Sequence, residues 1–552
     1  MPPPQLILGA LEQHVRASAA DAEQAAAKLK QRDASLWSRA EDVQAKIANR
    51  LGWLDSPQLM ASSATRLKRF GGNIKDNGFT DLVLLGMGGS SLAPEVLHRI
   101  IGVSAGYPRF HMLDSTDPAA VRAAATPPKT TLYIIASKSG GTIEPNSLAA
   151  HFRSTLVSAG VGNWAEHFIA ITDEGTDLAK RAQADRFREV FINPSNIGGR
   201  YSALSFFGMV PAALMGQDID RIIGSGVSML NEALSTSSAV NNPAVSLGLA
   251  MGIAAKKGKD KLTLLLPDGF ESFGLWVEQL VAESTGKNRT GIVPIAGEAV
   301  GAAAMYGDDR LFIDVRGIMS AALRPAVIYS WTDPFALGAE FVRWEIATAI
   351  AGALLNINPF DEPNVQQAKD ATNKLLETFK TTGSLPASSV DATLPNGITL
   401  TAAKGAKRVL ANAEPLKLLS TLKPGDYFAQ LAYVSPSSPV VAELDRLRVA
   451  VRDKMRVATT LGVGPRYLHS TGQLHKGGPN TGVFLLFTAG VAEDLTIPGQ
   501  PYTFGTLERA QALGDFASLD AANRRAIHVH LPSADPKVAR EAVDAFIRAM
   551  SA

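Results

Sequence analysis

Short apolar runs alternate with stretches of helical spacing along the first half of the chain. The runs occupy residues 81–87, 109–115, 131–137, 167–173 and 189–195, and the residues between them mostly repeat their apolar positions every three or four residues. Continuous apolar strands separated by helices are typical of a parallel sheet with helices on both faces. The pattern therefore predicts an α/β fold built on a doubly wound parallel sheet.

The same rhythm restarts twice. Strand-like runs begin again at residues 261, 291 and 310, after the linker-like stretch 235–244, and at residues 426, 481 and 525, after a stretch rich in Pro and Gly at 381–397. Helical spacing dominates residues 10–70, and a further helix is expected over 441–460. We predict an N-terminal helical segment (1–60), two doubly wound parallel-sheet units (61–238 and 239–382) and a third, C-terminal α/β unit (398–552).

Composition narrows the classes of function. The 552 residues carry a net charge of +2, which argues against a nucleic acid or an anionic membrane as partner. The absence of cysteine excludes disulfides and thiolate metal sites. Because the N-terminus has no basic region and no apolar run approaches the ~18 residues of a membrane span, we expect a cytoplasmic protein.

Two stretches rich in glycine and serine follow strands of the first unit. They read GMGGSS (86–91) and SKSGGT (137–142). A glycine-rich turn after a parallel strand lets backbone N–H groups approach an anion, and hydroxyls with an ammonium group suit a phosphate. Tight turns that cap the next helix would look similar. The predicted phosphate ligands are Gly89, Ser90, Ser137, Lys138, Ser139 and Thr142.

A helix expected from about residue 270 to 284 carries a carboxylate on its apolar face. Phe273, Trp276, Leu280 and Glu283 follow one another at steps of three and four residues, and Gly286 is placed to end the helix. Burial and the negative end of the helix dipole raise the pKa of a carboxyl group, which suits a base that takes a proton from carbon. A buried ion pair is the alternative interpretation of Glu283.

Five motifs in order resemble the phosphoglucose isomerase family, which is built from sugar isomerase domains. Besides GMGGSS and SKSGGT they are NIGGRYSALSFFGMVP (196–211), EQLVAESTGKN (278–288) and NPFDEPNVQQAK (358–369). The third unit, with GPRYLHSTGQLHKGGPNTGVFLL (464–486), is most similar to the isomerase half of bifunctional transaldolase/phosphoglucose isomerase proteins. The resemblance implies interconversion of glucose 6-phosphate and fructose 6-phosphate without metal or other cofactor, in a possible homodimer.

The resemblance also implies roles for the matching residues. Glu283 is the expected base, Arg200 lies beside the oxygens of the enediolate, and Lys369 lies near the ring oxygen of the sugar. Glu144 is expected close to the phosphate loop, although an acid in the first turn of a helix would look the same. Gln279, one helical turn before the base, is expected to bind a sugar hydroxyl, with a satisfied core amide as the alternative.

The sequence departs from the family pattern at two places. The family usually carries its ring-opening histidine shortly after the base helix, whereas residues 297–310 contain none. Imidazole is the natural proton carrier near neutral pH, and two histidines lie in the glycine-rich stretch HSTGQLHKGG of the third unit. Because HSTG…PN resembles the HTDG-type segment of some bacterial isomerases, we predict His469 for this role, with His475 as the alternative. Glu362 stands where the family usually has glutamine.

Taken together, the sequence predicts a glucose-6-phosphate isomerase that moves a proton through an enediolate. Two alternatives stay open. One is an isomerase that also accepts mannose 6-phosphate, and the other is a regulator that binds sugar phosphates without catalysis.

Overall fold

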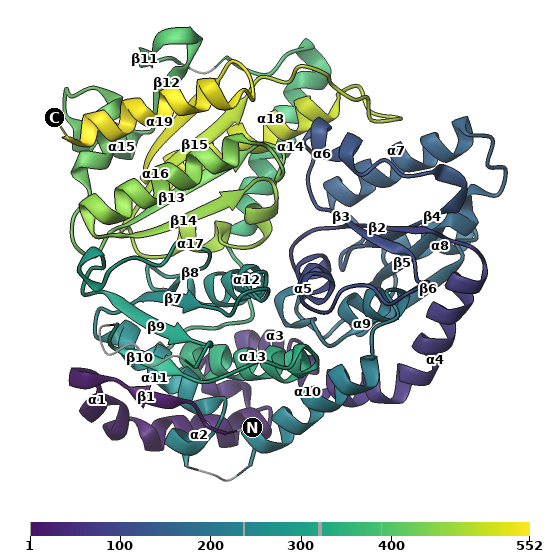
Figure 1. Cartoon of the computed structure of the whole chain (residues 1–552), viewed down its shortest axis with the longest axis horizontal. Helices are drawn as coiled ribbons and strands as arrows, with labels where there is room; N and C mark the ends of the chain where they lie inside the picture. Colours follow the sequence, from purple (N-terminus) through teal and green to yellow (C-terminus); the bar gives the residue numbers. More distant parts are fainter. Residues whose placement is uncertain (1, 236–237, 318–322, 388, 552) are drawn as a thin grey trace.

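The computed structural model describes residues 2–235, 238–317, 323–387 and 389–551, which form three sheets with helices between them (Figure 1). The linker-like stretch 235–244 and the boundary stretch 381–397 each contain residues outside these ranges, namely 236–237 and 388. The first sheet lies on one side of Figure 1, and the second and third lie one above the other on the opposite side.

The first sheet has five parallel strands in the order β3-β2-β4-β5-β6. Because the strand order reverses beside β2, a crevice for ligands is expected at the carboxyl ends of β2 and β4, where GMGGSS and SKSGGT begin. The strands are β2 (Asp81–Gly86), β3 (Arg109–Leu113), β4 (Thr131–Ala136), β5 (Phe168–Asp173) and β6 (Glu189–Asn193). The helices are α4 (Ser56–Asp76), α5 (Leu92–Ile101), α6 (Pro118–Ala123), α7 (Ile143–Ser158), α8 (Asp177–Ala184), α9 (Phe206–Leu214) and α10 (Ile219–Ala233).

The second sheet has the order β1-β10-β9-β7-β8. Its first strand comes from the N-terminal segment that the sequence predicts as helical, and it pairs antiparallel with β10. The strands are β1 (Gln5–Ile7), β7 (Lys261–Leu265), β8 (Val293–Ile295), β9 (Arg310–Asp314) and β10 (Ala326–Ile328). The helices are α1 (Glu12–Ala17), α2 (Ala19–Lys30), α3 (Glu41–Ala48), α11 (Val245–Lys256), α12 (Phe273–Thr285), α13 (Leu337–Leu354) and α14 (Val365–Thr382).

The third sheet has the order β11-β12-β16-β15-β13-β14, and its last four strands are parallel. Residues 458–460 belong to a strand, not to the predicted helix, because the helix ends at Met455 and Arg456 takes a left-handed conformation with φ 54°. The strands are β11 (Ala392–Thr393), β12 (Thr399–Ala402), β13 (Tyr427–Tyr433), β14 (Ala458–Val463), β15 (Gly482–Ala489) and β16 (Arg525–Leu531). The helices are α15 (Lys404–Leu410), α16 (Val440–Met455), α17 (Gly472–Gly477), α18 (Phe504–Ala521) and α19 (Pro536–Ser551).

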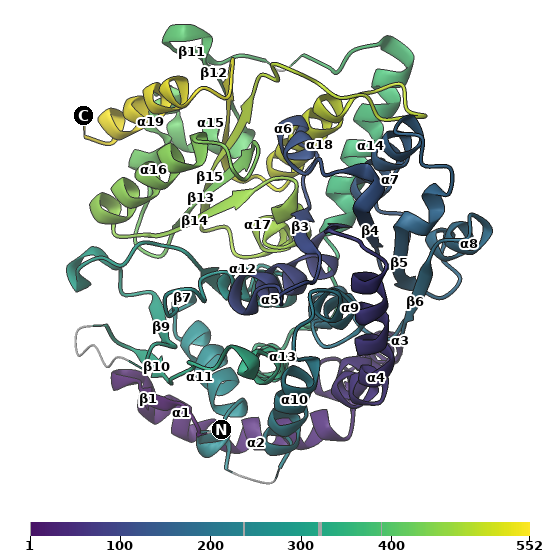
Figure 2. The ribbon, with the colours of Figure 1, turned by 45° about the vertical axis from the view of Figure 1, so that its right-hand side comes forward.

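Each pair of units shares a hydrophobic core. One core runs from the N-terminal helices through the first sheet to α12 and α13, a second joins the first sheet to α14 and α18, and a third joins α12 and β8 to the third sheet. Helices α5, α12 and α17 consequently lie side by side where the units meet (Figure 2). The predicted fold class, two doubly wound parallel-sheet units with a third α/β unit, is confirmed.

Within the described ranges, every helix is too short or too polar to cross a bilayer.

Candidate active site

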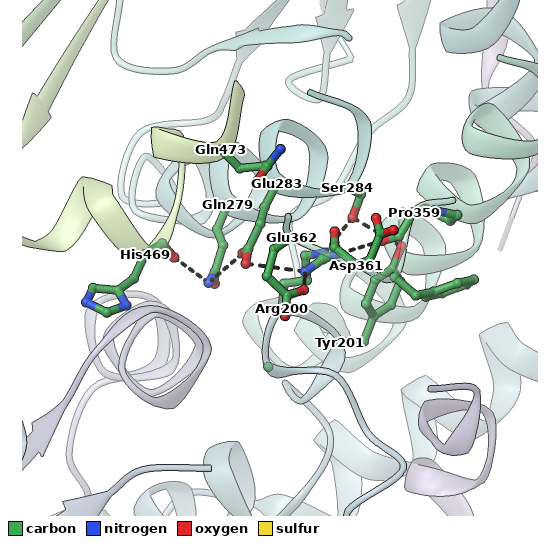
Figure 3. Close-up of polar contacts among 12 residues, drawn as sticks. Arg200, Tyr201, Gln279, Glu283, Ser284, Pro359, Asp361, Glu362, His469 and Gln473 are labelled. Atoms are coloured by element: carbon green, nitrogen blue, oxygen red, sulfur yellow. Dashed lines mark hydrogen bonds and ion pairs between the residues drawn. The ribbon is translucent and has the colours of Figure 1, made fainter. Parts of the chain in front are cut away.

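Four chain segments meet at one place in the molecule and present the polar groups of the candidate site (Figure 3). They are α12, the 3₁₀ turn Gly199–Tyr201, the loop 359–362, and the 3₁₀ turn Arg466–His469. The first turn belongs to the first unit and the last turn to the third. All three units therefore contribute to one cluster of side chains.

Glu283 lies in the last turn of α12, on the apolar face that the spacing predicts. Trp276 and Leu280 on the same face are fully buried, and Glu283 itself is 9% exposed. Its carboxylate accepts a hydrogen bond from Nε2 of Gln279 at 3.2 Å and lies 3.3 Å from Nη1 of Arg200. Burial raises the pKa of Glu283, the Arg200 charge opposes this, and the Glu362 charge adds to it, leaving the pKa above the usual carboxyl value. The group is thereby a stronger base than an exposed glutamate.

Arg200 is held in one orientation because all three nitrogens of its guanidinium group donate hydrogen bonds. Nε donates to Oγ of Ser284 at 2.8 Å, and Nη2 donates to the carbonyl oxygens of Pro359 at 2.7 Å and Asp361 at 3.0 Å. Nη1 donates to Oε2 of Glu362 at 3.0 Å. Two carboxylates, those of Glu283 and Glu362, thus share a single guanidinium nitrogen.

Gln279 connects the base to the third unit. Its Nε2 also donates to the backbone carbonyl of His469 at 2.7 Å, as Figure 3 shows. The contact leaves room only for glycine at position 88, where φ is +55° and a Cβ would lie 2.7 Å from that carbonyl oxygen and 2.8 Å from Nε2 of Gln279. A Cβ on Gly89 would overlap the carbonyl oxygen of Gly199. The glycines of GMGGSS therefore serve the close packing of three segments.

A cavity of about 170 Å³ lies on the other side of His469. The loop after β4 contributes Ser139 and Thr142, α14 contributes Lys369, and Gln511 of α18 completes the wall with Glu144 and His469. It thus combines hydroxyls, a lysine, an imidazole and a carboxylate, the groups that a sugar phosphate requires.

Glu144 orients His469 within this cavity. Oε1 of Glu144 lies 2.9 Å from Nε2 of His469 and accepts from Nε2 of Gln511 at 2.8 Å. Burial would raise the pKa of Glu144, but the neighbouring His469 holds it below the usual carboxyl value. Because an ionised carboxylate only accepts hydrogen bonds, Nε2 of His469 carries the proton and Nδ1 is the ring atom able to accept one.

Comparisons with known proteins identify the family of the chain. Residues 57–307 match the family described as phosphoglucose isomerase. A glucose-6-phosphate isomerase of Prochlorococcus marinus is 31% identical over 393 residues, which cover 59% of this chain and 71% of that protein. The chain belongs to the phosphoglucose isomerase family. A second relative of that name, from Trichormus variabilis, is 34% identical over 221 residues, which cover 39% of this chain and 42% of that protein.

A glucose-6-phosphate isomerase from Chlamydia trachomatis aligns with 64% of this chain and 78% of its own, with 20% sequence identity and a TM-score of 0.49.

His469 and His475, the two histidines predicted for ring opening, lie in different surroundings. His469 faces the cavity, whereas His475 is 2% exposed and packs on Tyr427 and Phe484. Nδ1 of His475 lies 3.1 Å from the Tyr427 hydroxyl, and burial lowers the pKa of His475 to about 3. The structure therefore brings His469, and not His475, to the predicted ligands.

Of the predicted phosphate ligands, Ser139 and Thr142 line the cavity and Lys138 does not. Its ammonium group pairs with the carboxylate of Asp173 and donates to the carbonyl oxygen of Ser195 at 2.8 Å. Asp173 ends the neighbouring strand β5, so it offers Lys138 a closer partner than the cavity does. Ser137 hydrogen-bonds Thr142 at 3.0 Å, and Ser90 lies buried in the turn after β2, so neither forms part of the cavity wall.

Gln511 and Ser284 are site residues that the sequence did not reveal. Gln511 lies on α18, 367 residues beyond Glu144, in a stretch without a recognisable motif. Ser284 directly follows the base, and its role depends on the approach of Arg200 from another unit. In the part of the chain that the structure describes, three or more His, Asp or Glu side chains do not come together as a metal site would require.

Proposed function

We propose that the protein catalyses the reversible interconversion of glucose 6-phosphate and fructose 6-phosphate. The observation that carries the proposal is the buried carboxylate of Glu283, which lies between Arg200 and Gln279 and has a raised pKa, in a chain of the phosphoglucose isomerase family. An aldose–ketose isomerisation needs such a base, together with a cation at the oxygens that become negatively charged.

The cavity supplies the first steps of this scheme. Ser139 and Thr142, at the start of α7, hold the phosphate, where hydroxyls and the positive end of a 16-residue helix favour an anion. His469 then moves a proton at the ring oxygen and opens the sugar ring, with Lys369 on the facing wall to stabilise negative charge on that oxygen. Glu144 keeps the imidazole oriented during this step.

Proton transfer between carbons follows at Glu283. The carboxylate takes the proton from C2 of glucose 6-phosphate, the electrons of that C–H bond form a C1–C2 double bond, and the carbonyl electrons move onto O1 to give the enediolate. The proton of the C2 hydroxyl then passes to O1 and Glu283 protonates C1, which leaves the carbonyl group at C2. Arg200 stabilises that negative charge, a contribution that is large in a buried site. Oε1 of Gln279 is buried and has no hydrogen-bond partner among the described residues, so it can accept a hydrogen bond from a sugar hydroxyl.

Isomerisation in heavy water tests the proposal. Starting from fructose 6-phosphate, the glucose 6-phosphate formed should carry deuterium at C2, because Glu283 exchanges its proton with solvent before returning it. Product can be followed by a coupled dehydrogenase assay and the label by proton NMR. If neither product nor label forms, the proposed activity is wrong. If product forms without any label, either the buried carboxyl group returns its proton before exchange or a hydride shift operates, and loss of turnover in Glu283→Gln distinguishes the first from the second.

A further inference from the structure

A second cavity lies between the third unit and the end of α14, outside the proposed isomerase site. It measures about 410 Å³ and sits at the carboxyl ends of β13, β15 and β16, represented in its wall by Tyr433, Thr488 and His530. Open sheets of parallel strands bind ligands at this edge, and the volume is that of a small-molecule site. The first turns of α18, with Glu508 and Arg509, close its other side.

Arg509 brings a positive charge to this cavity without a matching carboxylate. Its Nη1 donates to Oγ1 of Thr488 at 2.6 Å and to Nδ1 of His530 at 2.9 Å. Among the described residues no carboxylate lies within ion-pair distance of its guanidinium, and burial lowers the pKa of Arg509. A partly buried charge without a counter-ion is unfavourable, and a bound anion would relieve it.

The neighbouring titratable groups do not cancel that charge. Guanidinium nitrogens only donate, so Nδ1 of His530 accepts and the imidazole is neutral, in agreement with burial lowering its pKa to about 4. Asp494 also lines the cavity, where its Oδ1 accepts from the N–H of Gly505 at 2.8 Å and its Oδ2 from the hydroxyl of Thr503 at 2.6 Å. These neutral donors fix its orientation, and no ion pair joins it to Arg509 among the described residues. Arg509 is thus the cationic side chain of the cavity wall, and it has no carboxylate partner among the described residues.

Glu508 gives the second and independent indication of a ligand. The residue is 5% exposed and lines the cavity, yet its Oε1 has no hydrogen-bond partner among the described residues. Burial raises the pKa of Glu508 well above the usual carboxyl value, and the charges of Asp117 and Asp494 add to this. Glu508 and Arg509 thus line the same cavity, and an uncharged carboxyl group can donate a hydrogen bond to a ligand there.

We propose that this cavity is a second binding site, for a small oxyanion held by the guanidinium of Arg509 and the carboxyl group of Glu508. Phosphate and carboxylate groups share the required chemistry, since both offer several oxygens that accept hydrogen bonds from a guanidinium. The site is separate from the isomerase cavity, although α18 contributes Arg509 to one and Gln511 to the other.

Calorimetric titration with inorganic phosphate, and separately with malonate, tests the site and distinguishes the two anions. Whichever anion binds should lose at least about tenfold in affinity in Arg509→Met, whereas Arg509→Lys, which keeps the charge, should retain binding. Thr142→Val alters only the isomerase cavity and should leave the Arg509-dependent event unchanged. Circular dichroism melting of each variant checks its folding.

Equal affinities of the wild type and Arg509→Met for both anions would overturn the site. If Arg509→Met does not fold, Glu508→Leu serves instead, because it removes the donor without removing the arginine. Weaker binding in Glu508→Leu supports the site, and unchanged binding refutes it. Because binding is measured directly, this result does not depend on whether the protein isomerises sugars.

Discussion

Replacing Glu362 by glutamine should shift the acid limb of the isomerase pH profile to lower pH. Glu283 must be unprotonated to accept the proton from C1 of fructose 6-phosphate, so activity in that direction falls as the pH drops through its pKa. The negative charge of Glu362 raises that pKa. Glutamine removes the charge and keeps the shape, so Glu283 loses its proton at a lower pH and stays active there.

The size of the shift follows from the shared guanidinium nitrogen. Oxygens of Glu283 and Glu362 lie 3.3 Å and 3.0 Å from Nη1 of Arg200, so these two oxygens are at most about 6 Å apart. Two charges at that distance repel by about 0.7 kcal/mol in water and about 2.8 kcal/mol at an effective dielectric constant of 20. The Glu362 side chain is 43% exposed, which places the interaction toward the lower value. A shift of about 0.5 to 1 pH unit results.

The measurement is kcat/KM for fructose 6-phosphate between pH 5 and 9, for the wild type, Glu362→Gln and Glu362→Asp. The aspartate variant keeps the charge and should retain most of the wild-type acid limb. All three share the ionisation of the substrate phosphate, so a difference between them belongs to the protein. An acid limb that coincides in the wild type and Glu362→Gln would refute the reasoning, whatever the change in absolute rate.

Three further outcomes are expected from the same geometry. Glu283→Gln should lower kcat by at least about 10³-fold while sugar phosphate binding persists in calorimetry, and turnover near the wild-type rate would move the base elsewhere. His469→Asn should lower kcat by about 10²- to 10⁴-fold. His475→Asn should leave kcat unchanged and reduce the free energy of unfolding, measured in urea titrations, by about 1–3 kcal/mol. The reverse pattern would assign ring opening to His475. Gly88→Ala should cost about 1–3 kcal/mol of stability and lower kcat, because its Cβ displaces the His469 carbonyl and Gln279; a stable and fully active variant would contradict that packing.

The main strands and the base helix could be predicted because their patterns are local. The run at 81–87 contains β2, and the apolar steps that end at Glu283 describe α12 to within a few residues. Strands of three residues, such as β1 and β10, are too short to leave a pattern and form through pairing with each other. Strand β14 was missed because its apolar residues continue the spacing of the helix before it.

Individual residues of the candidate site could be predicted from the sequence, but the contacts between them could not. Glu283 and Arg200 lie in motifs, yet nothing in those motifs indicates that Glu362 shares the arginine. The Glu144–His469 contact spans 325 residues and depends on the docking of the third unit. Lys138 was predicted as a phosphate ligand because it lies in a loop rich in glycine and serine. In the structure its ammonium group pairs instead with Asp173, at the end of the neighbouring strand β5.

The contact between Gln279 and the backbone of His469 makes the proposed active site depend on a part of the chain that is synthesised late. When the first 400 residues have left the ribosome, the carboxylate and the arginine are already present, but the imidazole and Gln511 have yet to be translated. A nascent chain of that length therefore lacks part of the proposed site. Catalytic competence arrives late, with the docking of the last sheet.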